Sequence, residues 1–386
     1  MPDHKRNSSF QNMAAATLVS TFALLGATHA TASENEVWSG SFETGDILQW
    51  HHPEVHTAPW IWGIPEYCRP DTFDGVFGGD GSCLSVSRDI TRHGEYSARF
   101  TVKNAANGEE PRDCDSGERC HRRRSQLSNY HTLPDVYNAL PYGEERWISF
   151  SIYLPENWQP ADGGWGVSLA GFKPRNNTSS VSGVANLVIL DESWQIHHRW
   201  SSVLNPTQDD VPWRQNMIYR KDYPQPGSDW EDGELDFPSP DESRTALGSI
   251  NKGGWTDWVI HVKFDARGSG DGGEGFLRYY KREDDGPWVK VVDIEPRATE
   301  RAGQSFDRGI GYHVPPSDGT NGGYGMGIGL YMRKEIAWYA PDNLTVYFDN
   351  IRIGDENASL REMAPDSVPA HRALPEPPQA INVRAH

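Results

Sequence analysis

Tyr331 lies in a segment whose alternation of side chains is typical of a half-buried β-strand. One side of this segment is apolar and the other carries small, aromatic and basic groups: Met326, Ile328, Leu330 and Met332 against Gly327, Gly329, Tyr331 and Arg333. Because successive side chains of a strand point to opposite faces, Tyr331 and Arg333 should share a surface. A phenol on such a surface can act as a general acid or base, and a guanidinium can bind a carboxylate.

Two further segments repeat this separation of polar from apolar side chains. In the first, alternation sets Gln195, His197 and Arg199 against Trp194, Ile196, His198 and Trp200. In the second, it sets Arg124, Gln126 and Ser128 against Ser125 and Leu127. An imidazole titrates near neutrality, so His197 is suited to proton transfer. Arg124, Gln126 and Gln195 are suited to binding a carboxylate.

These groups could transfer protons and bind an anion, so they are candidates for acid-base chemistry on a negatively charged ligand. Each residue also has an ordinary interpretation, because tyrosine is common on half-buried sheets and the other polar groups could form solvated faces. Their joint occurrence on three polar strand faces favours a site.

The composition predicts the elements that position these residues. Gly 38, Pro 27, 11% aromatic residues and a mean hydropathy of -0.68, with almost no apolar run at helical period, favour many short strands joined by turns. The 386 residues fit one large all-β domain with long loops. The clearest strands are expected at 146–155, 255–265 and 345–354.

The N-terminus has the three-part form of a secretory signal. His4, Lys5 and Arg6 precede an apolar segment at 13–26 and a small-residue site near Ala32. We therefore expect a signal peptide over residues 1–32, with export to the periplasm or the medium. Nothing later reaches the roughly 20 apolar residues of a membrane helix.

Four cysteines fit an oxidising compartment: Cys68, Cys83, Cys114 and Cys120. Their proximity favours pairing Cys68 with Cys83 and Cys114 with Cys120, although four cysteines allow three connectivities. Zinc is the competing interpretation, but the sequence contains no CxxC and the spacings match no common finger.

The net charge of -18 argues against nucleic acid as a partner. It does not argue against an acidic polysaccharide, because binding depends on the local field and not on the total charge. We expect a monomer.

Several segments in order resemble the concanavalin-like β-jelly-roll polysaccharide lyases, particularly the heparin-lyase-I-like group, with glucuronan and alginate lyases as structural relatives. The resemblance covers about Trp38 to Gly354 and rests on these stretches: SFETGDILQW, GEYSARFTVK, RRSQL, GEERWISFSIYLPENW, KGGWTDWVIHVKF and VYFDNIRIG. It implies a β-sandwich jelly roll of two antiparallel sheets. It also implies β-elimination on a uronic-acid-containing polysaccharide.

The resemblance assigns roles to particular positions. Tyr331 matches the tyrosine of a Lys-x-Gly-x-Tyr strand whose lysine is missing here, and Gln126 replaces an acid in an Arg-Ser/Thr-Glu-Leu strand. Gln195-Ile196-His197 repeats a Gln-Ile-His of alginate lyases, whereas heparin-lyase-like enzymes place this motif one strand earlier, at Lys173. The base is therefore either His197 or Lys173. The predicted substrate-binding residues are Arg124, Gln126, Gln195, Arg199 and Arg333.

Glu43 and Asp349 form a candidate calcium site, because first and last strands that pair would bring these hard oxygen ligands together. No cofactor is required by the predicted reaction, and two solvated acids are an equally good interpretation. No EF-hand-like loop occurs.

Two other functions remain open. A glycoside hydrolase on this architecture would need paired carboxylates, for which Glu234 and Asp236 are the nearest candidates. A non-catalytic carbohydrate-binding protein would explain the 15 Trp and the missing lysine and acid. In all three cases the β domain is expected over 33–354, with residues 205–248 as a loop and 355–386 as a disordered tail.

Overall fold

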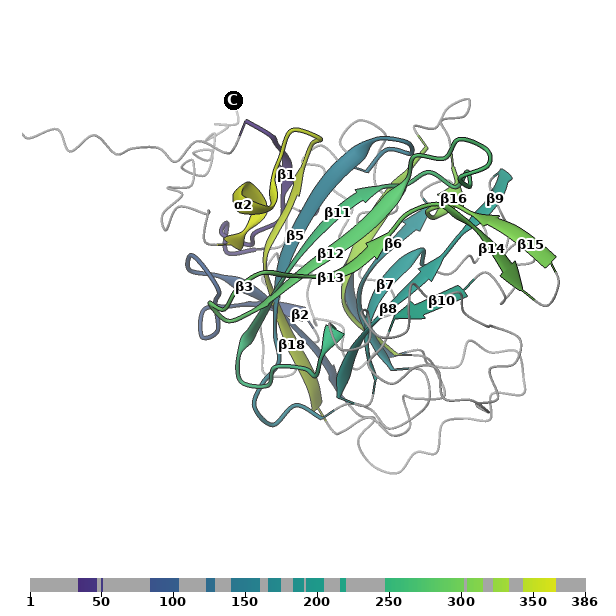
Figure 1. The fold of residues 1–386 in the computed structure, drawn as a ribbon. Coiled ribbons are helices and arrows are strands. Elements are labelled where there is room, and N and C mark those ends of the chain that lie inside the picture. The colour runs from purple at the N-terminus through teal and green to yellow at the C-terminus, as the bar shows by residue number, and fades with distance from the viewer. Residues whose placement is uncertain are drawn as a thin grey trace, which may run out of the picture.

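The computed structural model describes residues 34–46, 50, 84–103, 123–128, 140–159, 166–174, 183–190, 192–204, 216–219, 247–301, 304–314, 322–332 and 343–365. Nearly all elements in these ranges are strands, and they form two antiparallel sheets that face one another (Figure 1). The predicted all-β sandwich of two antiparallel sheets is therefore confirmed.

The larger sheet contains eight strands within the described residues. Its order from edge to edge is β13 (Val289–Ile294), β12 (Phe276–Glu283), β11 (Trp255–Lys263), β5 (Glu145–Tyr153), β18 (Asn343–Gly354), β3 (Ser97–Lys103) and β2 (Leu84–Ser87), and β1 (Glu36–Ser39) also pairs with β18. The first and last strands thus meet, as expected, with Ser39 opposite Arg352.

The smaller sheet holds the three polar segments singled out above. Its six described strands run β10 (Asn216–Tyr219), β8 (Ser193–Arg199), β7 (Ala185–Leu190), β6 (Val167–Pro174), β17 (Tyr324–Met332) and β4 (Arg123–Ser128). Two short pairs complete the strands: β14 (Arg297–Arg301) with β15 (Gln304–Arg308), and β9 (Ser201–Leu204) with β16 (Tyr312–His313).

The core lies between the two sheets and is formed by the apolar side of each alternating strand. In β5 and β11 the predicted inward residues Ile148, Phe150, Trp258 and Ile260 are all buried. The apolar side of β17 is buried in the same way. The opposite side of the smaller sheet therefore faces away from the core and carries Tyr331.

The chain remains folded beyond residue 355, where the disordered tail was expected to start. A short helix, α2 (Leu360–Met363), follows β18 and lies beside it and β1 (Figure 1). Ser359 caps it by accepting the Glu362 N–H, and Met363 is buried with Trp147 and Val259. The expectation that disorder begins at 355 was wrong, because a capped turn with an apolar side chain covers the outer face of the larger sheet.

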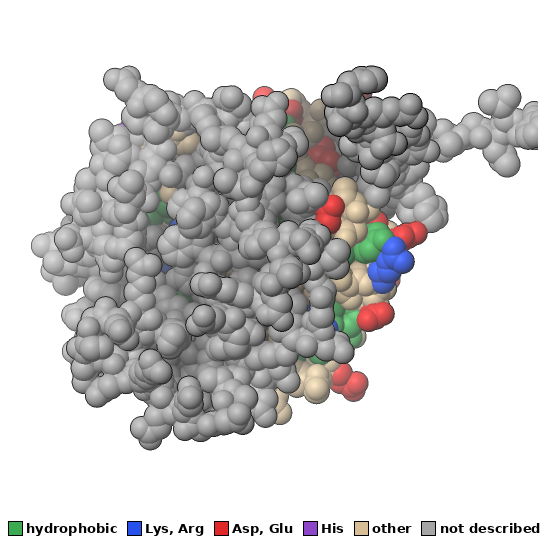
Figure 2. All heavy atoms as spheres, turned by 180° about the vertical axis from the view of Figure 1, so that it is seen from behind, with side chains coloured by type: hydrophobic (Ala, Val, Ile, Leu, Met, Phe, Trp, Pro, Cys, Tyr) green, Lys and Arg blue, Asp and Glu red, His purple; other side chains and the backbone are tan. Residues whose placement is uncertain are grey.

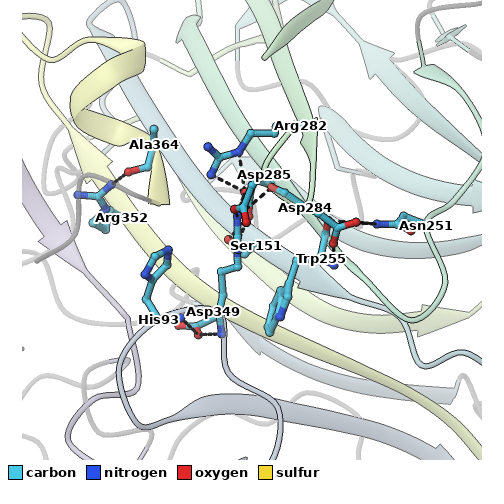
Figure 3. Close-up of polar contacts among 12 residues, drawn as sticks. His93, Ser151, Asn251, Trp255, Arg282, Asp284, Asp285, Asp349, Arg352 and Ala364 are labelled. Carbon is cyan, nitrogen blue, oxygen red and sulfur yellow. Dashed lines mark hydrogen bonds and ion pairs between the residues drawn. The ribbon is translucent and has the colours of Figure 1, made fainter. Parts of the chain in front are cut away.

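A buried carboxylate links the segment before β3 to the larger sheet. Asp257 accepts hydrogen bonds from Arg92, Arg282 and Ser151, and Arg92 also binds Asp285. Figure 3 shows Ser151, Arg282 and Asp285 close together in this cluster. Because a buried charge is tolerated only when its acceptor capacity is filled, these contacts fix the position of residues 88–96.

Acidic side chains of the described residues stand singly along one flank of the molecule in Figure 2. The acidic side chains visible on that flank are therefore separated from one another and do not form one patch.

Candidate active site

Tyr331 lies on the outer face of the smaller sheet, as the alternation of β17 places it, next to a local irregularity in the pairing with β6. The register with β6 shifts between Ile328 and Tyr331, where Gly329 has a φ of 109°. A side chain at Gly329 would meet the Ser125 carbonyl oxygen at 2.3 Å, so only glycine fits there. After this bulge Tyr331 is half-buried, whereas Ile328 and Leu330 are fully buried.

One row of directly paired residues crosses five strands at the level of Tyr331. From β8 to β4 the row is Gln195, Val188, Ser168, Tyr331 and Arg124. Tyr331 and Arg124 are thus neighbours across adjacent strands, at the ~5 Å separation that pairing imposes. Gln195 lies three strands away from Tyr331, or about 14 Å across the sheet.

A second row lies toward the other end of the same strands. It contains His197, Asn186, Gly171, Gly327 and Ser128. His197 is half-buried and its Nε2 lies 3.1 Å from Oε1 of Gln195, which is only 2% exposed. Since the amide oxygen can only accept, the imidazole donates from Nε2 in this contact.

Lys173 lies beyond the second row, paired with Gly325, and is half-buried. It is five residues from Ser168 along β6, or roughly 17 Å at ordinary strand rise. His197 is about 16 Å from Tyr331 by the same geometry. Neither candidate base is a neighbour of Tyr331, so a sugar ring would have to lie between Tyr331 and either of them.

Of the remaining predicted substrate-binding residues, Gln126 and Arg199 lie within the described residues and Arg333 does not. Gln126 is half-buried and pairs with Gly329, and Arg199 donates from Nη1 to the Gly183 carbonyl oxygen at 3.0 Å. Arg333 lies outside the described residues, as do the four cysteines, Glu234 and Asp236. The pairing of the cysteines therefore stays a prediction.

Asn186 is a polar residue of this face that the alternation analysis did not single out. It projects between His197 and Gly171, while its neighbours Ala185 and Leu187 are buried. The alternation of the sequence ANLVIL already marked it, since Asn186 is the polar member of an otherwise apolar strand.

Glu43 and Asp349 are both tied to residues 92–96. Asp349 accepts from the backbone N–H groups of Arg92 and His93, at 2.7 and 3.1 Å, and Glu43 accepts from those of Glu95 and Tyr96, at 2.9 and 3.3 Å. Burial raises the pKa of Asp349 well above its usual range, and the charge of Glu43 raises it further.

This carboxylate pair has the hard oxygens that calcium prefers, but supplies only part of the six to eight that the ion takes. Within the described ranges, no group of three or more His, Cys, Asp or Glu residues could hold a metal ion. Further oxygens would have to come from backbone carbonyls or water. Calcium at Glu43 and Asp349 stays a prediction.

Known structures with similar folds include an endo-β-1,4-glucuronan lyase from Trichoderma reesei, 13% identical, with a TM-score of 0.42 over 70% of this chain and 86% of that one. An alginate lyase from Aplysia kurodai is 12% identical, with a TM-score of 0.36 over 83% and 99%. An alginate lyase from Klebsiella pneumoniae is 10% identical, with a TM-score of 0.38 over 71% and 84%.

The sequence itself is the stronger basis for a family assignment. No curated protein matches it significantly. The family model described as polysaccharide lyase matches residues 42–352, which is well over half of the chain and includes both rows of the outer face. The protein therefore belongs to the polysaccharide lyase family.

Proposed function

We propose that the protein is an exported lyase that cleaves a uronic-acid-containing polysaccharide by β-elimination. The observation that carries this proposal is that Tyr331, on the outer face of the smaller sheet, pairs directly with Arg124 on the adjacent strand β4, within the family match. This pairing supports a proton-transfer group beside a carboxylate-binding position. The glucuronan and alginate named for two similar structures support a uronate as the substrate class.

The reaction divides among the residues as follows. Arg124 and Gln126 bind the uronate carboxylate and stabilise the negative charge that develops when C5 loses its proton. Gln195 lies too far from Arg124 to share that carboxylate and instead holds His197. The electron pair of the C5–H bond forms the C4–C5 double bond as the C4–O bond breaks. Tyr331 protonates the departing oxygen, and the base is His197, Lys173 or Tyr331 itself.

Export follows from the predicted signal peptide at residues 1–32, which lies outside the described residues. Among the residues that the structure describes, no helix is long and apolar enough to cross a membrane. The expected partner is an acidic polysaccharide bound by a monomer.

A panel of glucuronan, heparin, alginate and neutral glucans tests the proposal. We expect reducing ends and the ultraviolet band of an unsaturated uronate to rise together on one acidic polymer. Reducing ends without that band would indicate a hydrolase and contradict the proposal. Binding without either signal would indicate a carbohydrate-binding protein and contradict it as well.

A further inference from the structure

Three aromatic side chains and an arginine form a row across the outer face of the larger sheet. Tyr153 follows the buried Ile152, so it lies on the side away from the core. It pairs directly with Trp255 of β11 and with Tyr347 of β18, and its ring centroid is 5.5 and 5.9 Å from theirs. Arg99 of β3 pairs with Tyr347. We call these four residues the aromatic row, which spans three strand spacings, or about 14 Å.

Other parts of the same face are covered by the chain, whereas the aromatic row keeps contact with solvent. The helix α2 and the residues before it pack on one end of the face, and Arg92 binds Asp257 in the row next to the aromatic one. Tyr153 and Trp255 are half-buried, and Arg99 is exposed. Packing between neighbouring strands therefore accounts for only part of each side chain.

The polar atoms of the aromatic row are left for water or a ligand. Among the described residues, no hydrogen bond is made by the hydroxyls of Tyr153 and Tyr347 or by the indole N–H of Trp255. None of these atoms is buried without a partner, unlike the indole N–H groups of Trp147 and Trp258. The row therefore offers hydrogen bonds beside apolar ring surface, the combination that a sugar ring with its hydroxyls and C–H groups requires.

Arg99 places a positive charge at one end of the row. It forms no ion pair with any residue that the structure describes. Burial raises the pKa of Tyr347, while Arg99 lowers it and Asp89 raises it with a smaller effect, so both charges lie near this ring. An exposed guanidinium without a carboxylate partner in the protein is complementary to the carboxylate of a uronic acid.

We propose that the aromatic row is a second, non-catalytic binding site for an acidic polysaccharide, whose sugar rings lie against the aromatic side chains and one of whose carboxylates binds Arg99. This proposal rests on the proposed function for the nature of the polymer. The outer faces of the two sheets point in opposite directions, so a sugar held here does not contact Tyr331. The site keeps a long chain close to the protein between cuts and raises its effective concentration at the catalytic face.

The test compares Arg99→Gln and Trp255→Ala with Arg361→Gln, which removes the same charge from an exposed arginine of α2. Affinity electrophoresis on the long polymer is run in a Tyr331→Phe background, so that the chain stays intact. We expect affinity to fall about 3- to 5-fold for Arg99→Gln and about 10-fold for Trp255→Ala, and to be unchanged for Arg361→Gln. If Trp255→Ala does not fold, Trp255→Phe keeps a ring in place, removes the N–H and should lose about 3-fold.

Two further substrates separate this site from the catalytic face. A short oligosaccharide cannot reach both faces, so with Tyr331 intact the variants should cleave it with the kcat/KM of the wild type. On the polymer with its carboxyls reduced to alcohols, Arg99→Gln should bind as well as its parent, while Trp255→Ala should still bind more weakly.

Unchanged affinity for the long polymer in either Arg99→Gln or the Trp255 variant would overturn the proposal. So would an equal loss of kcat/KM on the short oligosaccharide, or a loss in Arg99→Gln that is equal on the acidic and the reduced polymer. If the wild type forms no unsaturated product, the lyase assignment fails, and the comparison of polymer affinities still decides whether the second site exists.

Discussion

The proposed mechanism depends most on Tyr331, because Tyr331 would protonate the departing oxygen and is the neighbour of Arg124, which would bind the carboxylate. It is half-buried on the outer face and pairs with Arg124. Tyr331→Phe keeps the ring and its packing and removes only the hydroxyl. We therefore expect turnover to fall by ~10² to 10⁴ with little change in melting temperature or polymer affinity.

Initial rates, thermal melting and affinity electrophoresis on the same preparation check this prediction. Tyr280→Phe is the matched control, because it removes the same hydroxyl from a strand of the larger sheet, away from the site. A folded Tyr331→Phe protein that cleaves at the wild-type rate would rule out proton transfer by Tyr331.

The identity of the base is decided by a comparison of His197→Ala with Lys173→Ala. His197 is held by Gln195 at 3.1 Å, and an imidazole is a common general base, so we expect its removal to cost ~10²-fold or more in turnover. Lys173→Ala should raise KM with a smaller effect on kcat, as loss of a polymer contact would. Measuring kcat and KM separately distinguishes the two, and the reverse pattern would move the base to Lys173.

Alternation alone placed most of these side chains correctly on one sheet. Tyr331, Gln195, His197 and Gln126 are on the side that their apolar neighbours implied. Asn186 was not singled out, because its contacts are with Gly171 and Gly183, which belong to another strand and to a preceding loop. Such a contact depends on register between strands, which alternation within one strand does not specify.

At the scale of elements, His261 joins three strands of the larger sheet. It stacks on Trp147 of β5 with centroids 3.8 Å apart, contacts Phe276 of β12 and lies 2.5 Å from Glu145. Burial lowers the pKa of His261, and this outweighs the hydrogen bond to Glu145, which raises it. Arg278 and Asp293 also face it, with opposite and smaller effects.

The lowered pKa predicts the direction of a pH effect on stability. Below the unfolded histidine pKa of about 6.5, the unfolded chain binds more protons at this position than the folded one. The contribution of His261 is therefore present above that pH and is lost as the pH falls toward the folded pKa. We expect the melting temperature of the wild type to fall more between pH 7 and 5.5 than that of His261→Gln. Parallel slopes for the two proteins would contradict this.

The junction of the first and last strands is the second element that can be tested. Burial and the charge of Glu43 raise the pKa of Asp349, and a divalent cation would offset that repulsion. If calcium binds there, a chelator should lower the melting temperature of the wild type, and added calcium should restore it. Glu43→Gln should remove most of this response. A wild type that melts at the same temperature with and without chelator would exclude a stabilising calcium ion.

At the scale of the whole molecule, the clear alternation of β5, β11 and β18 and the glycine-rich turns predicted an all-β domain, and the resemblance to the jelly-roll lyases implied the sandwich of two sheets. It could not predict the order of strands from local pattern, since β18 lies between β5 and β3 and β4 lies beside β17, far apart in the chain. The segment after β18 was misjudged for a related reason. Its few apolar residues become stable only against Trp147 and Val259, which belong to other strands.

The central claim is that this fold cleaves its polymer by elimination, and the masses of the products test it most directly. A defined uronate oligosaccharide from the polymer that the panel identifies should be digested and all fragments weighed by mass spectrometry. We expect the two fragments of each cut to sum to the mass of the substrate, with the unsaturated ring on the fragment at the new non-reducing end. Fragments that together exceed the substrate by one water would show hydrolysis and contradict the account.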